Sequence, residues 1–246
     1  MNGRGRLVER WYPEVRFGGF TDVDGTVAFY SRVNSLLEPS FTVLDLGCGR
    51  GAAAEDPIRW RRDLQIFKSR CECVIGADVD PDAAVNPHID EFRLIENDRI
   101  PLESETIDLC ISDAVVEHVA DVDLFFAECA RVLKPGGYLC IRTPNARNYA
   151  SVASRVVPNR LHARVLGRIQ PRRKSADVFP TLYRCNTVKR LRAALERQGL
   201  ECVVRSYEPE PAYLSFSRLA YAIGVLHQRH APRAFRRTLL AYARKR

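Results

Sequence analysis

The stretch VLDLGCGRG, residues 43–51, decides the fold of this chain. An apolar run leads directly into three glycines at alternate positions, Gly47, Gly49 and Gly51. Glycine lets the backbone turn sharply and approach a ligand closely, and the N–H groups that open a following helix favour an anionic group. The same pattern also fits a tight strand-to-helix turn without a ligand, so residues elsewhere in the chain must decide between the two.

Short β-rich segments alternate with helical patterns on both sides of this loop. The predicted strands are FTVLDL (41–46), CVIGAD (73–78), FRLIE (92–96), IDLCIS (107–112) and GYLCIRT (137–143). A helix is predicted over VDLFFAECARVLK (122–134), ended by Pro-Gly-Gly. Further on, NTVKRLRAALERQGL predicts a helix capped by Asn186 and ended by Gly199, followed by the strand ECVVRSYE. This alternation predicts an α/β fold with a parallel sheet.

The 246 residues, 46% of them hydrophobic, suffice for one sizeable α/β domain with appendages. We expect five segments: an N-terminal cap (1–40), a ligand-binding core (41–145), a basic, proline-containing substrate lid (146–185), the completion of the α/β core (186–210) and basic C-terminal helices (211–246). The segment EDPIRWRRDLQIFKSR (55–70) is expected to be a modest insertion after the first helix.

Charge is distributed unevenly along the chain. Residues 1–141 contain 15 Lys and Arg against 25 Asp and Glu, whereas residues 142–246 contain 23 against 5. A basic block of this kind predicts an anionic ligand, nucleic acid or an anionic membrane surface, and the alternative is a solvated arginine-rich face without a partner.

The C-terminal segment combines this charge with an apolar stripe, and it predicts peripheral contact with anionic lipid or a lipid-linked acceptor. The alternative is that the stripe packs on the sheet. The basic residues concerned are Arg218, Arg229, Arg233, Arg236, Arg237, Arg244, Lys245 and Arg246.

The cysteines and the apolar runs of the sequence also bear on metal binding and on where in the cell the protein is expected. None of the eight cysteines forms a CxxC pair, so we expect reduced core thiols and no metal site. The N-terminus has no apolar core of the signal-peptide kind, and the run LAYAIGVL is too short to span a membrane, so we expect a cytoplasmic protein.

Several motifs follow the glycine loop in a fixed order across residues 41–145: VIGADVDP, ENDRIPL and RVLKPGG. In this order the sequence resembles the class I S-adenosylmethionine (SAM)-dependent methyltransferases, of the methyltransferase type 11 kind. The resemblance implies a Rossmann-like fold, a mostly parallel twisted sheet with helices on both faces, extended here by a helical lid and C-terminal helices. It implies SAM as the cofactor, S-adenosylhomocysteine (SAH) as its product, and no metal.

The resemblance also assigns cofactor residues. It implies that Gly47, Cys48 and Gly49 line the methionine end of SAM and that Asp45 holds its amino group. Asp78 would accept from both ribose hydroxyls, as a carboxylate at a strand end can. The remaining assignments are Val79 beside the adenine, Asp98 (with Asn97 as the alternative) on the adenine amino group, Arg99 covering the base, and Asp113 on the cofactor side of the fourth strand.

Methyl transfer needs a nucleophile aligned behind the methyl group, and a hydroxyl acceptor would need a base. His118, which follows the fourth strand on the cofactor side, is the candidate catalytic residue because its ordinary pKa suits proton transfer near neutrality. The alternative for His118 is a structural or cofactor contact, and Asp113 and Glu117 lie nearby. Tyr30 and Arg32 are expected to fold over the SAM carboxylate or, alternatively, to lie on a helix that covers the sheet edge.

The sequence thus predicts a SAM-dependent methyltransferase acting on an O or N nucleophile, with C less favoured, of a small-molecule acceptor that is anionic or lipid-linked. An NAD-dependent oxidoreductase is a rival because GCGRGA approaches GxGxxG. A nucleic-acid methyltransferase is favoured by the basic half, but the fourth strand ends in SDAV, without the Asn/Asp-Pro-Pro-aromatic element typical of base-amino methyltransferases. The third rival is a SAM-binding subunit that does not catalyse.

Overall fold

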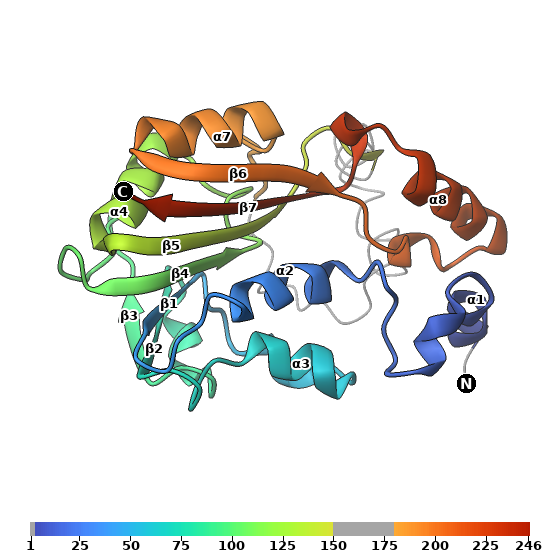
Figure 1. Cartoon of the computed structure of the whole chain (residues 1–246), viewed down its shortest axis with the longest axis horizontal. Coiled ribbons are helices and arrows are strands. Elements are labelled where there is room, and N and C mark those ends of the chain that lie inside the picture. The colour runs from blue at the N-terminus through green and yellow to red at the C-terminus, as the bar shows by residue number, and fades with distance from the viewer. Residues whose placement is uncertain (1–2, 150–179) are drawn as a thin grey trace.

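A seven-stranded sheet forms the centre of the computed structural model, which describes residues 3–149 and 180–246 (Figure 1). Its strand order is β3-β2-β1-β4-β5-β7-β6. The strands β3 to β5 are parallel, and β7 runs antiparallel to both of its neighbours. The strands are β1 (Thr42–Leu46), β2 (Cys73–Asp78), β3 (Glu91–Leu94), β4 (Ile107–Asp113), β5 (Leu133–Pro144), β6 (Leu200–Tyr207) and β7 (Thr238–Lys245). The predicted mostly parallel α/β sheet is confirmed.

Helices cover both faces of this sheet. The α-helices are α1 (Gly3–Trp11), α2 (Gly25–Asn34), α3 (Arg59–Gln65), α4 (Val122–Val132), α7 (Val188–Arg197) and α8 (Arg218–His230). Short 3₁₀ turns lie at Pro13–Arg16, Ala52–Glu55, Pro81–Val85, Ala212–Leu214 and Arg233–Phe235. Helices α4 and α7 lie on one face of the sheet and α2 and α3 on the other (Figure 1). Buried side chains of α4 and α7 belong to one apolar core, and those of α2 and α3 belong to the other.

The alternation of side chains along β1 shows how one strand supplies both cores. Leu44 and Leu46 are buried with α4 and α7, whereas Val43 is buried with α2 and α3. Successive side chains of a strand point to opposite faces, so a strand covered on both faces must be apolar throughout. Asp45 breaks this rule in β1 and stays a candidate for the cofactor contact predicted for it.

The C-terminal segment differs from the prediction. Helix α8 is present, but Thr238–Lys245 forms β7, inserted between β5 and β6, so the expectation of helices to the end of the chain is wrong there. Pro232 follows α8 and cannot continue its hydrogen bonding. Beyond it, Leu239, Leu240 and Ala241 are fully buried, which fits a central strand covered on both faces.

Three smaller boundaries also differ. The segment expected as an insertion contains α3, so it is part of the helical layer. The N-cap of α7 is Thr187, whose side chain accepts from the Arg190 N–H, while Asn186 is buried and bonds elsewhere. Helix α4 ends at Val132, and the Pro-Gly-Gly turn lies inside β5, where the register with β4 shifts.

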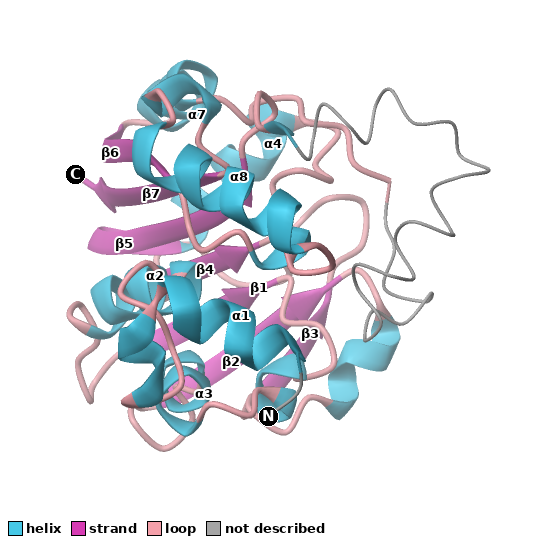
Figure 2. Ribbon diagram, turned by 90° about the vertical axis from the view of Figure 1, so that its right-hand side faces the viewer, coloured by secondary structure: helices cyan, strands magenta, loops and turns pink. Residues whose placement is uncertain are grey.

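A small apolar cluster joins α1 and α8 beside the sheet. Tyr12, Tyr221 and Val225 are buried together, with Leu7 and Trp11 packed against them. Figure 2 shows α1 and α8 in front of the end of the sheet that faces the viewer. Most of the predicted lid, 150–179, lies outside the described residues. In the part of the chain that is described, no helix is long and apolar enough to cross a membrane.

Candidate cofactor and active site

The strand order reverses between β1 and β4, because β2 and β3 lie on one side of β1 whereas β4 and β5 lie on the other. In open α/β sheets, ligands bind at this switch point, outside the carboxyl ends of the strands. The glycine loop follows β1, and the segment from Asp113 to His118 follows β4. The structure therefore brings these two predicted parts of the site to the same end of the sheet, on neighbouring parallel strands.

The glycine loop is held against the end of β2 by its own backbone. The N–H of Gly47 donates to the carbonyl of Ala77 at 2.7 Å, and the N–H of Gly49 donates to Oδ2 of Asp78 at 2.9 Å. Gly47 has a φ of +79°, and a Cβ there would overlap Cγ2 of Val115, so only glycine fits. At Gly49 a Cβ would meet no atom within 4 Å, so the loop borders open space on that side.

Asp78 occupies the position predicted for it, at the end of β2 and almost fully buried. Its second oxygen, Oδ1, accepts from the N–H of Asp80 at 2.9 Å. Each carboxylate oxygen has two lone pairs, so both retain capacity for a ligand hydroxyl. Val79 beside it is 54% exposed, which provides an apolar surface next to the carboxylate.

Asp45 interacts electrostatically with two other carboxylates, those of Asp113 and Asp78. The pKa of Asp45 is raised to about 7. Burial is the largest cause, and the negative charges of Asp113 and Asp78 also contribute. A carboxylate in such surroundings is stabilised by a cation. The amino group of a bound amino acid moiety has the charge that this position favours.

Asp113 takes part in a partly buried hydrogen-bond network that the sequence did not predict. Arg142 of β5 donates to Oδ1 through Nε at 2.7 Å and to Oδ2 through Nη2 at 2.5 Å. Tyr30 of α2 donates its hydroxyl to Oδ2 at 2.9 Å, and Arg142 also donates to Oγ1 of Thr26 at 2.8 Å. This network joins α2 to β4 and β5 beside the glycine loop.

These contacts also place the N-terminal residues. Tyr30 is buried, and the guanidinium of Arg142 lies 5.4 Å from the centre of its ring, whereas Arg32 is exposed. Burial and the neighbouring charge of Asp113 raise the pKa of Tyr30 well above its ordinary value, so its hydroxyl stays a donor. A direct contact of Asp113 with the cofactor stays a prediction, since its carboxylate already accepts from Arg142 and Tyr30.

Glu117 and His118 lie beyond β4 in a second polar group. Glu117 is buried, its Oε2 accepts from the hydroxyl of Thr143 at 2.9 Å, and burial raises the pKa of its carboxyl. The amide of Asn186 donates to the same hydroxyl at 2.6 Å, which explains why Asn186 does not cap α7.

His118 lies at the edge of this group. Its Nδ1 is 2.8 Å from the carbonyl of Pro180, and its Nε2 is 4.0 Å from Oε1 of Glu117. Because a carbonyl can only accept, the neutral ring places its proton on Nδ1 and its lone pair on Nε2. This arrangement suits the proton transfer for which His118 was predicted, and the catalytic role itself stays a prediction.

The predicted adenine residues lie one strand further from the switch point. Asn97 and Asp98 both have left-handed backbone conformations in a tight turn after β3, closed by a bridge between Glu96 and Arg99. Asp98 and Arg99 are exposed, and their contact with a base stays a prediction.

Cys48 lies in the glycine loop as a thiol. Burial raises its pKa to about 12, which favours the neutral thiol and fits a packing role in the loop. Within residues 3–149 and 180–246, no group of three or more His, Cys, Asp or Glu is arranged to hold a metal ion.

Sequence reasoning missed several residues that shape the site. Asn86 donates its amide to the carbonyls of Cys48 and Gly49, at 2.9 and 3.2 Å, and thereby fixes the loop from the side of β2. No local signal marks this residue. Arg142 does have a local signal in the sequence. It is a charged residue in the otherwise apolar strand LCIRT, and such a residue needs a partner of opposite charge when it is buried.

Comparison with known proteins agrees with this geometry. A model described as a methyltransferase domain matches residues 44–141. The ubiquinone biosynthesis O-methyltransferase of Chelativorans sp. (strain BNC1) is 29% identical over 157 residues, which cover 58% of this chain and 56% of that protein. The protein of the same name from Rhizobium etli is 34% identical over 103 residues, which cover 42% of this chain and 41% of the relative. The chain thus spans about half the length of these relatives.

Solved structures share the fold. An S-adenosylmethionine-dependent methyltransferase from Mesorhizobium loti has a TM-score of 0.55 and 20% identity, over 89% of this chain and 98% of that one. Geranyl diphosphate C-methyltransferase from Streptomyces coelicolor has a TM-score of 0.54 and 15% identity, over 89% and 78%. The strand order, the switch-point loop and the matching domain define a SAM-binding methyltransferase fold. Residues 44–141 match a methyltransferase domain, and this match, the curated relatives and the shared fold together support a SAM-dependent methyltransferase.

Proposed function

We propose that this protein transfers the methyl group of SAM to an oxygen of a small-molecule acceptor by in-line displacement. The observation that carries the proposal is the glycine loop at the switch point, anchored to Asp78 and bordered by Asp45. The names of the relatives, which are O-methyltransferases, support oxygen rather than nitrogen as the acceptor atom.

The residues at the switch point fit SAM in three respects. Gly47 and Gly49 allow the backbone to approach a ligand, and Asp45 can pair with an amino group. Asp78 retains lone pairs for the ribose hydroxyls, beside the apolar surface of Val79. The bound cofactor would supply a methyl group attached to a sulfonium. The thioether of SAH is a good leaving group, so the methyl group is already activated for transfer.

The protein's own task is then to position the acceptor and to remove its proton. The Tyr30, Asp113 and Arg142 network holds α2 against the strand ends and thereby limits access of water from that side. His118 would accept the hydroxyl proton on Nε2, with Glu117 close enough to stabilise the imidazolium that forms.

Cofactor binding and turnover are tested separately. Calorimetry should show that SAH binds and that NADH does not, and Asp78→Asn should weaken SAH binding at least tenfold because one charge-assisted contact is lost. Failure of the wild-type protein to bind SAH would overturn the proposal.

Turnover is measured as SAH release from SAM in the presence of phenols, catechols, amines or RNA. Release with a hydroxyl acceptor supports the proposal, whereas release only with RNA or only with amines contradicts it. His118→Gln should lower kcat by about 10²-fold or more and leave the affinity for SAH unchanged. His230→Gln, on the exposed face of α8, is the matched control and should retain full activity. Equal kcat in the two variants would remove His118 from the mechanism.

A further inference from the structure

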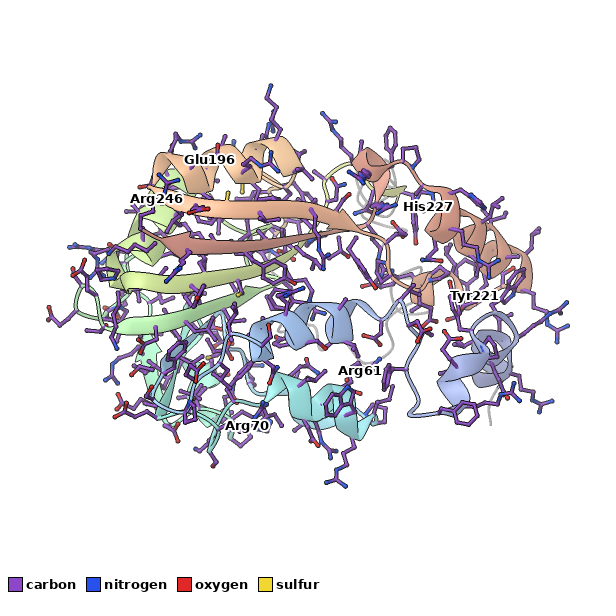
Figure 3. The ribbon with its side chains drawn as sticks, in the orientation of Figure 1. Arg61, Arg70, Glu196, Tyr221, His227 and Arg246 are labelled. Carbon is purple, nitrogen blue, oxygen red and sulfur yellow. The ribbon has the colours of Figure 1, made fainter. Side chains whose placement is uncertain are left out.

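Helix α8 buries one face and exposes the other. Tyr221, Gly224 and Val225 are buried, and Figure 3 shows Tyr221 on the side of α8 that faces α1. The hydroxyl of Tyr221 donates to Oε1 of Glu210 at 2.8 Å. A Cβ at Gly224 would lie 2.6 Å from Cβ of Pro211, so α8 is seated closely on the chain beneath it. Its orientation is therefore set by packing.

The outward face of α8 is apolar. Leu219, Ile223 and Leu226 are 73, 58 and 62% exposed, and Phe216, just before the helix, is 63% exposed. Positions three and four apart lie on one side of a helix, so these side chains form a continuous stripe. Contiguous exposed apolar surface of this kind marks an interaction site in a folded protein. The alternative in which the stripe packs on the sheet is therefore wrong for these four side chains.

Basic side chains accompany the stripe. Arg218 and Arg229 are exposed on α8, and Arg233 is exposed in the turn that follows. No Asp or Glu occurs between Pro211 and Arg246, so the segment carries positive charge alone.

The other basic residues of the predicted set lie elsewhere. Arg244 and Lys245 belong to β7 and contact the carbonyl of Gly136 and the carboxylate of Glu105. Figure 1 places the C-terminus at the end of the sheet opposite to α8. Only the arginines next to the stripe can act together with it.

We propose that α8 docks on an anionic lipid bilayer, with Leu219, Ile223 and Leu226 at the boundary of the acyl chains and the flanking arginines on lipid phosphates. An amphipathic helix with a basic border binds membranes in this way, lying in the plane of the interface. Each arginine near an anionic leaflet adds about 1 kcal/mol, and its long aliphatic stem allows the guanidinium to reach the headgroups.

Charge complementarity favours lipid over a second copy of the chain. Two copies packed stripe to stripe would bring their arginines together without acidic residues of this segment to neutralise them, and like charges across an interface are unfavourable. An anionic bilayer supplies both the apolar phase and the opposite charge.

The position of α8 means that docking would affect how an acceptor reaches the glycine loop. β7 runs antiparallel to β5, so β5 and its parallel neighbours point away from the C-terminus, toward the end of the sheet where α8 lies (Figures 1 and 2). Docking would place the glycine loop near the membrane surface, where a lipid-soluble acceptor is concentrated. This consequence depends on the proposed function, but the docking itself does not.

The test is sedimentation of the full-length protein with vesicles. Wild-type protein should bind vesicles of phosphatidylcholine and phosphatidylglycerol at low salt and bind weakly to phosphatidylcholine alone. The triple variant Leu219→Gln, Ile223→Gln, Leu226→Gln should lose at least about tenfold in partitioning because three apolar side chains no longer enter the bilayer. Val203→Thr, at an equally exposed position on β6, should partition as the wild type does.

A second variant separates charge from apolar contact. Arg218→Gln, Arg229→Gln, Arg233→Gln should lose about fivefold in partitioning per residue at low salt, and little at high salt. Thermal unfolding and SAH binding check that all variants are folded. The proposal is overturned if the wild type does not sediment with anionic vesicles, if the leucine and isoleucine variant sediments equally well, or if light scattering shows a dimer that this variant dissociates.

Discussion

Asp45 illustrates how the surroundings of a single residue change its acidity. In another strand it would be an ordinary carboxylate, but here burial and two neighbouring acids raise its pKa to about 7. Since the folded pKa lies above the ordinary 3.8, ionisation of Asp45 opposes folding. Its contribution to the free energy of unfolding falls as pH rises between 3.8 and about 7, and is constant above.

The same pKa predicts pH-dependent binding of SAH. A bound amino group favours the ionised carboxylate, so the affinity should rise with pH up to about 7 and then level off, with a proton released on binding near neutrality. Calorimetry in buffers of different ionisation enthalpy measures the released proton. Asp45→Asn should bind SAH weakly, without the rise below pH 7. An equally steep rise in that variant would assign the titration to another group.

Gly47 is the second residue whose role is set by close contact. Gly47→Ala should reduce SAH affinity at least tenfold and lower the melting temperature, because the new Cβ overlaps Val115 and the left-handed backbone costs about 1–2 kcal/mol. Gly199→Ala is a matched control, since Gly199 has a φ of +72° with open space around its Cβ. It should show the backbone cost alone and bind SAH normally. Equal losses in both variants would show that contact with Val115 is unimportant.

Among the elements, β4, β5 and α2 are joined by the ion pair between Arg142 and Asp113. The pair lies in β5 and β4, and it reaches α2 through Tyr30 and Thr26. Both side chains are about one-fifth exposed, at 20% and 19%, so water screens the pair only partly. Burial of such groups is favourable only while both partners are present.

Removing one partner should therefore cost more than removing both. Arg142→Met should lower the free energy of unfolding by about 3 kcal/mol, since Asp113 is left with an uncompensated charge. The double variant Arg142→Met, Asp113→Asn should recover a large part of this loss in denaturant unfolding. Additive losses in the double variant would mean that the two side chains are not energetically coupled.

On the scale of the whole molecule, β7 closes the sheet. It pairs with β5 on one side and β6 on the other, so the last residues of the chain join the segments before and after the predicted lid. A chain lacking residues 238–246 should fail to fold, because β5 and β6 lose their common partner and buried apolar side chains lose their contacts. Circular dichroism and urea unfolding would show the loss of a cooperative transition.

Removal of Arg246 alone is the control for this truncation. Its side chain is 79% exposed, so the shortened chain should unfold as the intact one does. A cooperative transition in the chain without residues 238–246 would contradict a structural role for β7.

Local sequence determined the elements whose signals are local. Strands β1, β2 and β4 were predicted within a residue of their ends, and the glycine loop was recognised, because alternation, apolar runs and glycine spacing depend on near neighbours. The motif order, added to these signals, also pointed to SAM. The motifs that indicate a SAM-dependent methyltransferase thus lie within residues 41–145.

The remaining features depend on contacts between segments that are distant in the sequence. Strand β7 was expected as helix, since TLLAYARK carries no period that separates a buried strand from a buried helix. The pairing of Arg142 with Asp113 and Tyr30 joins residues far apart in the chain, and the stripe on α8 is exposed because α1 and Pro211 pack against its other face. A sequence records which side chains are apolar or charged, whereas burial and partners depend on which distant segments the fold brings together.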